Sequence, residues 1–67
     1  MLTLKFVDQD MEIVVAVNSY EKTKRDDGGW NILVTSPFEK EYVVEGGITL
    51  YVENAAGKTI DRVRARV

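Results

Sequence analysis

The chain has 67 residues, a net charge of −2, and neither cysteine nor histidine. We expect one domain covering residues 1–67, and domains of this size bury only about 60% of their unfolded surface. The missing residue types exclude a disulfide framework, a zinc ribbon and a thiol nucleophile, and remove the commonest general base. β-branched and aromatic residues outnumber Ala, Leu and Met by 25 to 10, which favours a mainly β fold.

The first two predicted strands form a hairpin with one wholly apolar face. They cover Leu2–Val7 and Met11–Val17, with a polar turn between them. Pairing Phe6 with Ile13 places apolar residues opposite each other along that face, and a slip by one residue would exchange the two faces. The other face mixes polar side chains with valine and alanine. We therefore expect it to be partly covered, by the rest of the fold or by another subunit.

The middle of the chain contains a polar segment and a third strand. Residues 18–29 are mostly polar and end in two aspartates followed by two glycines, a composition typical of turns. The third strand covers Trp30–Ser36, and its alternation places Trp30, Ile32 and Val34 on one face. We expect that face, including Trp30, to join the core.

Residues 37–45 fit two structures. The Ser36–Glu39 segment has the form of a helix capping box with proline at the first helical position, and Gly46 would close the helix. The residues around Tyr42 are instead typical of a strand, which would place Tyr42 opposite Val34. We predict a short helix, with the strand as the alternative.

The last predicted hairpin joins Ile48–Glu53 to Lys58–Val67 through a four-residue loop that ends in Gly57. With this loop, Glu53 pairs with Lys58, and Gly57 must adopt the left-handed conformation. Apolar residues of both strands, up to Val67, then share one face, and Tyr51 lies with the arginines on the other. The element order as a whole predicts a five- or six-stranded antiparallel barrel or sandwich, OB-like or SH3-like, with one short helix around residues 37–45.

Positive charge concentrates near the C-terminus. Residues 1–57 carry five basic and ten acidic side chains, a balance of −5, and residues 58–67 carry four against one, a balance of +3. Arginines at alternate positions beside an aromatic ring fit a surface that follows phosphates and stacks a base. Solvated charges that protect an edge strand explain the same pattern. The candidate residues for binding a partner or nucleic acid are Tyr51, Arg62, Arg64, Arg66, Lys22, Lys24 and Arg25.

Nothing in the sequence indicates catalysis, a cofactor or a metal. No serine has a histidine to activate it, and neither GxxxxGK nor GxGxxG occurs. Asp8, Asp10 and Glu12 lack the spacing of an EF-hand loop. No apolar run approaches the roughly 20 residues of a membrane span. We expect a cytoplasmic protein without enzymatic activity, cofactor, metal or membrane association.

Two functions fit these observations. We predict a non-enzymatic protein-interaction module, such as an inhibitor, regulator or accessory subunit, that forms a homodimer or a hetero-complex. The alternative is an OB-like protein that binds single-stranded nucleic acid through the C-terminal arginine strand. The distribution of charge discriminates between them, because one continuous positive face favours nucleic acid and interleaved signs favour a protein partner.

Overall fold

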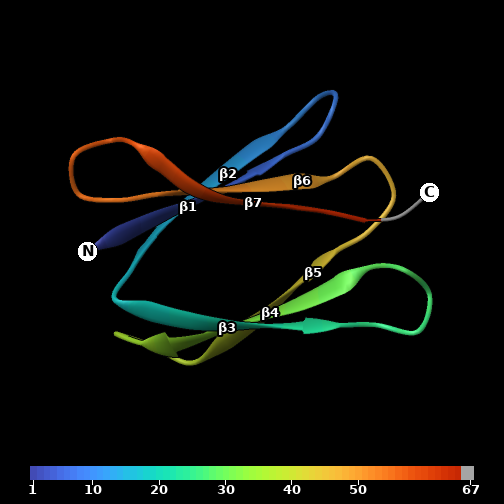
Figure 1. Cartoon of the computed structure of the whole chain (residues 1–67), viewed down its shortest axis with the longest axis horizontal. Helices are drawn as coiled ribbons and strands as arrows, with labels where there is room; N and C mark the ends of the chain where they lie inside the picture. The colour runs from blue at the N-terminus through green and yellow to red at the C-terminus, as the bar shows by residue number, and fades with distance from the viewer. Residues whose placement is uncertain (66–67) are drawn as a thin grey trace.

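Seven antiparallel strands form two sheets that pack face to face in the computed structural model, which describes residues 1–65 (Figure 1). The four-stranded sheet has the order β2-β1-β6-β7, from β1 (Leu2–Val7), β2 (Glu12–Val17), β6 (Thr49–Glu53) and β7 (Thr59–Arg64). The three-stranded sheet has the order β3-β4-β5, from β3 (Ser19–Lys24), β4 (Trp30–Ser36) and β5 (Lys40–Val44). No helix occurs in residues 1–65. The predicted mainly β, antiparallel fold is confirmed, but the expected number of five or six strands is wrong, because the described residues form seven.

The core lies between the two sheets, and both contribute to it. Phe6 of β1 stacks on Tyr42 of β5, with ring centroids 4.8 Å apart, so the layers are in direct aromatic contact. Trp30 and Tyr42 pack against the buried cluster, as predicted for Trp30. The buried hydrophobic residues are Leu4, Phe6, Val17, Leu50, Val52 and Val63 from the four-stranded sheet and Ile32, Val34 and Val44 from the other.

The first hairpin has the predicted register. Phe6 lies opposite Ile13, and the pairing continues without a shift from one end of the hairpin to the other. The backbone N–H of Asp8 donates to the carbonyl of Met11 at 2.9 Å and closes the turn. On its other side β1 pairs with β6, where Leu4 lies opposite Val52, so β1 is an interior strand.

Strand β3 lies within the segment predicted as a polar connection. It pairs with β4 along its length, with Lys22 opposite Ile32. Its sequence contains Tyr20 and polar residues alone, so no apolar alternation marks it as a strand. The backbone hydrogen bonds to β4 define residues 19–24 as a strand. The prediction that all of residues 18–29 form a polar turn segment is therefore wrong.

The predicted helix at residues 37–45 is also wrong. A turn with a cis Ser36–Pro37 peptide bond leads into β5, and Tyr42 lies opposite Ile32, not Val34. The alternative prediction of a strand is therefore correct, but its pairing with β4 is shifted by two residues from the predicted register. Pairing with β4 and the stacking of Tyr42 on Phe6 outweigh the capping signal at the proline.

Among the described residues, the last hairpin has the predicted faces and a different register, and Val67 lies outside those residues. Glu53 pairs with Thr59, and not with Lys58 as predicted. The register shifts between Val52 and Glu53, and beyond this shift Leu50 lies opposite Val63. Gly57 has a φ of 81°, as predicted. The shift is a bulge, which pairing arguments based on strict alternation do not foresee.

Candidate functional site

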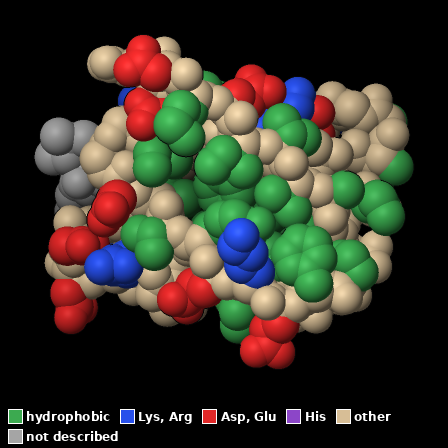
Figure 2. All heavy atoms as spheres, turned by 180° about the vertical axis from the view of Figure 1, so that it is seen from behind, with side chains coloured by type: hydrophobic (Ala, Val, Ile, Leu, Met, Phe, Trp, Pro, Cys, Tyr) green, Lys and Arg blue, Asp and Glu red, His purple; other side chains and the backbone are tan. Residues whose placement is uncertain are grey.

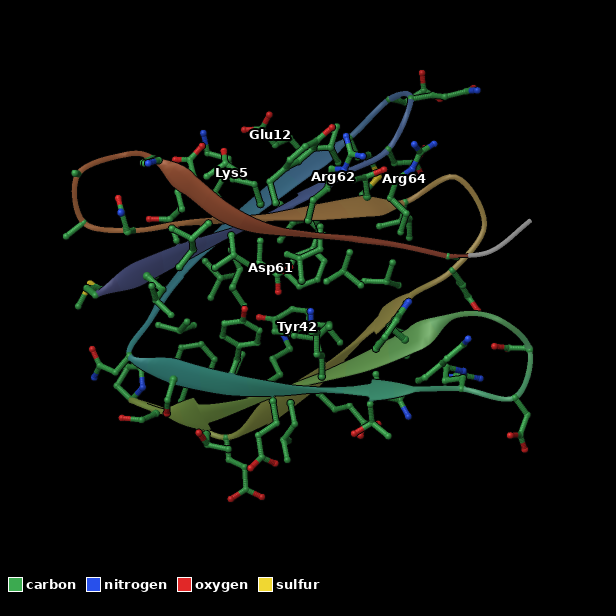
Figure 3. All side chains as sticks on the ribbon, in the orientation of Figure 1. Lys5, Glu12, Tyr42, Asp61, Arg62 and Arg64 are labelled. Carbon is green, nitrogen blue, oxygen red and sulfur yellow. The ribbon has the colours of Figure 1, made fainter. Side chains whose placement is uncertain are left out.

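The outer face of the four-stranded sheet brings together some of the predicted site residues. Tyr51 lies opposite Arg62 on one side and Lys5 on the other, and Arg64 is opposite Thr49 in the next row. The labelled side chains of Lys5, Arg62 and Arg64 all project from the sheet away from the core (Figure 3). The sequence thus placed Tyr51, Arg62 and Arg64 correctly on one surface. Arg66 lies outside the described residues.

Negative charge is interleaved with positive charge on this face. The Nζ atom of Lys5 lies 3.1 Å from the Oε2 atom of Glu53, so that positive charge is paired. Glu12 stands in the same row as Val7, Thr49 and Arg64, at the opposite edge of the sheet. The surface is therefore not one continuous positive field, because charges of both signs alternate on it.

The other three predicted site residues lie on the three-stranded sheet or its first turn. Lys22 is bound to Asp61, with an Nζ to Oδ2 distance of 2.8 Å, and its Nζ lies 5.7 Å from the centroid of the Trp30 ring. Lys24 is exposed at the end of β3. Arg25 donates to the side chain of Asn31 and forms an ion pair within its own turn. Lys22 and Arg25 are thus engaged in contacts within the fold.

Asp61 joins the two sheets along the rim formed by β3 and β7, which is nearest the viewer in Figure 1. Besides the ion pair with Lys22, it accepts a hydrogen bond from the Tyr20 hydroxyl at 3.2 Å. The hydrogen bond from Lys22 is the largest influence on the pKa of Asp61 and holds it below the ordinary value of 3.8. Partial burial, then the charge of Asp61, raises the pKa of Tyr20 above 10.0. Neither Asp61 nor Tyr20 was among the predicted site residues, although Asp61 alternates with the buried Val63 and so had to face inward.

The four edge strands differ in how they are protected against pairing with another chain. β3 has an irregularity at Ser19 and an inward-facing Lys22, and β7 has a bulge and an inward-facing Asp61. β5 is short and begins with the charged pair Lys40 and Glu41. These are the devices by which proteins protect sheet edges. β2 has the fewest of them, because its register is regular and its one charged residue is Glu12 at its start.

The open edge of β2 also carries exposed apolar side chains. Val14 is 54% exposed and Ile13 is 44% exposed, and Met11 just before the strand is exposed as well. Seen from behind, the molecule has hydrophobic side chains gathered across the middle of the face, with charged side chains both among and around them (Figure 2). We call the free backbone of β2 and the side chains of Met11, Ile13 and Val14 the β2 edge.

The hydrogen bond in the turn between β1 and β2 determines which backbone groups of β2 point away from β1. Because Asp8 and Met11 form a hydrogen-bonded pair, the alternation directs the N–H and C=O groups of Ile13 and Val15 toward β1. The same groups of Glu12, Val14 and Ala16 point to the open side. They are placed to pair with an added strand.

The rest of the described surface offers little chemistry. A hollow of about 400 Å³ is lined by Asp27, Gly29, Glu45, Gly46 and Ala65 and includes none of the predicted site residues. Within residues 1–65, no three acidic side chains are grouped to hold a metal ion. The same residues contain no helix long and apolar enough to cross a membrane. No protein-family model, curated protein or solved structure matches this chain.

Proposed function

We propose that this protein is a non-enzymatic interaction module that binds another protein chain by adding a strand to the β2 edge. The observation that carries the proposal is the contrast among the four edges: three are protected by charges or irregularities, and β2 is regular and largely apolar. Exposed apolar groups beside unpaired backbone groups are the two ingredients of strand addition, since the backbone supplies affinity and the side chains supply specificity.

A pair of matched variants tests this proposal. Val14 and Ile60 are 54% and 53% exposed and lie on opposite edge strands of the same sheet. Val14→Lys places a charge on the β2 edge, and Ile60→Lys places the same charge on β7. We expect both variants to stay folded, because neither side chain belongs to the core.

Each variant and the wild type serve as bait in affinity purification from the source organism, with quantitative mass spectrometry. We expect proteins that are enriched on the wild type and on Ile60→Lys, and whose abundance falls at least about tenfold on Val14→Lys. Capture that is equal on all three baits would refute a role for the β2 edge. Thermal unfolding of each bait checks that the loss does not come from misfolding.

Binding of single-stranded nucleic acid is the second candidate, and one observation favours it. Tyr51 is flanked by Arg62 and Lys5, an aromatic ring between cations on a sheet face. The OB-like barrel expected for this function stays a prediction. Fluorescence anisotropy with a mixed-sequence oligonucleotide at low salt tests it. Binding that weakens steeply with salt and is lost in Arg62→Ala, but not in Lys24→Ala, would support it, and no binding would exclude it.

A further inference from the structure

We propose that the chain added at the β2 edge is a second copy of this protein, with the two β2 strands antiparallel about a two-fold axis through Val14. This inference rests on the proposed function of the β2 edge and goes further, because it names the partner and the register of pairing. Three properties of β2 support it: its outward backbone groups, the position of its one charge, and the matching of its apolar faces.

The backbone sets the register. Only residues whose N–H and C=O groups point outward can form hydrogen-bonded pairs with a neighbour, and these are Glu12, Val14 and Ala16. With Val14 opposite Val14, all three take part, and Glu12 lies opposite Ala16 of the second copy. Each such pair exchanges two hydrogen bonds, so this register forms about six in total. A shift by two residues in either direction loses one pair.

The charge of β2 permits this pairing. Glu12 meets an alanine, so no like charges oppose each other across the new pair of strands. A register centred on Glu12 would oppose two carboxylates and is disfavoured. Strand β3, which contains Lys22 and Lys24, offers no comparable uncharged stretch. β2 is therefore better suited than β3 to pair with itself.

The apolar faces match as well. A two-fold axis perpendicular to the sheet keeps the inner faces of both copies on the same side, so Ile13 of one copy lies opposite Val15 of the other. Both are inner-face residues, opposite Phe6 and Leu4 in the hairpin. Pairing thus covers Ile13 and Val14, which are exposed in the single chain. The two four-stranded sheets become one continuous sheet, with both three-stranded sheets on the same side of it.

Substitutions of Ala16 test the register, because Ala16 faces Glu12 only in this arrangement. Ala16→Lys creates two symmetric Glu–Lys pairs, and Ala16→Glu creates two Glu–Glu pairs. Sedimentation equilibrium should show a wild-type dimer whose dissociation constant falls about fivefold with lysine and rises about fivefold with glutamate. Thr59→Lys and Thr59→Glu introduce the same charges on the exposed face of β7 and should leave the constant unchanged.

A cross-linking experiment gives a second readout. The chain contains no cysteine, so Val14→Cys introduces a single thiol. Hydrogen-bonded antiparallel pairs have Cα atoms about 5.5 Å apart, within the range of a disulfide. Mild oxidation should convert Val14→Cys to a covalent dimer and leave Ile60→Cys mainly monomeric. Equal cross-linking of both variants would overturn the proposal.

A wild type that stays monomeric at millimolar concentration would also overturn it. The β2 edge would then still be tested by the capture experiment, where loss on Val14→Lys but not on Ile60→Lys indicates a different protein as partner. Equal responses of the dimer to Ala16→Lys and Ala16→Glu would refute the register through Val14. The failure of this inference and the failure of the proposed function are therefore distinguishable.

Discussion

Lys22 of β3 and Asp61 of β7 join the two sheets along one rim, with Nζ 2.8 Å from Oδ2. The Tyr20 hydroxyl donates to the same carboxylate oxygen, and the Trp30 indole N–H donates to the backbone carbonyl of Arg64 at 3.2 Å nearby. This rim is therefore held by polar contacts. Away from this rim, the layers meet through the aromatic stack of Phe6 of β1 on Tyr42 of β5.

Removing the charge of Asp61 should weaken the fold modestly. We expect Asp61→Asn to lower the free energy of unfolding by about 1 kcal/mol, because its contacts with Lys22 and Tyr20 are partly exposed and screened by solvent. Urea denaturation measures the change. Asp10→Asn, in the exposed turn after β1, is the control and should have almost no effect. An equal loss in both variants would contradict the role of Asp61 as a bridge.

The same carboxylate predicts a loss of stability in acid. The folded protein holds the pKa of Asp61 below 3.8, chiefly through the hydrogen bond from Lys22. The ionised form is thus stabilised on folding, so its contribution is complete above the ordinary pKa and is lost as the pH falls through the folded value. Asp27, whose pKa is lowered chiefly by the backbone N–H of Gly29, acts with the same sign. Unfolding followed between pH 2 and 6 should show a shallower acid loss in Asp61→Asn.

Tyr20 predicts the opposite dependence in alkali. Burial, followed by the negative charge of Asp61, raises the pKa of Tyr20 above 10.0. The neutral phenol is favoured in the folded state, so its contribution is present below pH 10 and is lost as the pH rises through the folded pKa. We expect Tyr20→Phe to remove part of the alkaline loss of stability. Thermal unfolding from pH 8 to 11 measures this, and an unchanged profile would count against the prediction.

Gly29 should tolerate no side chain. A Cβ atom at this position would lie 2.6 Å from the backbone carbonyl oxygen of Val44, which a strand holds in place. We expect Gly29→Ala to destabilise the protein by roughly 1–3 kcal/mol. Gly47→Ala is the matched control, because a Cβ there meets nothing within 4 Å, and it should be neutral or slightly stabilising. Similar melting temperatures for the two variants would refute the close approach.

Gly57 is constrained by conformation alone. Its φ of 81° lies in the left-handed region, and a Cβ there would meet open space. We expect Gly57→Val to cost roughly 1 kcal/mol or more, since β-branched residues resist positive φ. Ala56→Val, one residue earlier in the exposed loop, should have a smaller effect. Chemical denaturation of the two variants measures the difference.

The sequence was sufficient where apolar alternation was unbroken. In the first hairpin, exchanging the faces would have exposed Leu4 and Phe6, so one register was strongly favoured, and the structure has it. The Trp30–Ser36 strand followed from the same argument and has the predicted bounds. The positive φ of Gly57 was predictable because glycine is the residue that closes a tight hairpin loop in the left-handed conformation, although the length of the loop differs from the predicted one.

Prediction failed where the stabilising contacts are between sheets. β3 has Tyr20 as its single large apolar residue, and Lys22 faces inward because Asp61 of the other sheet receives it. Nothing local to residues 19–24 indicates that partner. In the candidate site, the sequence correctly grouped Tyr51 with Arg62. It also assigned Lys22 to this site and did not indicate that Lys22 is bound to Asp61. The sequence could not indicate that β2 is an open edge, because the order of the strands in the sheet decides which strands lie at the edges.

The strand order also fixes when this fold can form during synthesis. β1 is made before the other six strands, yet one of its two partners in the sheet is β6, which follows only after β2 to β5 (Figure 1). Until β6 emerges from the ribosome, both sides of the first hairpin are free, and Leu4 and Phe6 lack the cover of Leu50 and Val52. Such contacts between distant parts of a chain form slowly and late. The nascent protein therefore passes through a stage with two open strand edges, and open edges of this kind favour aggregation.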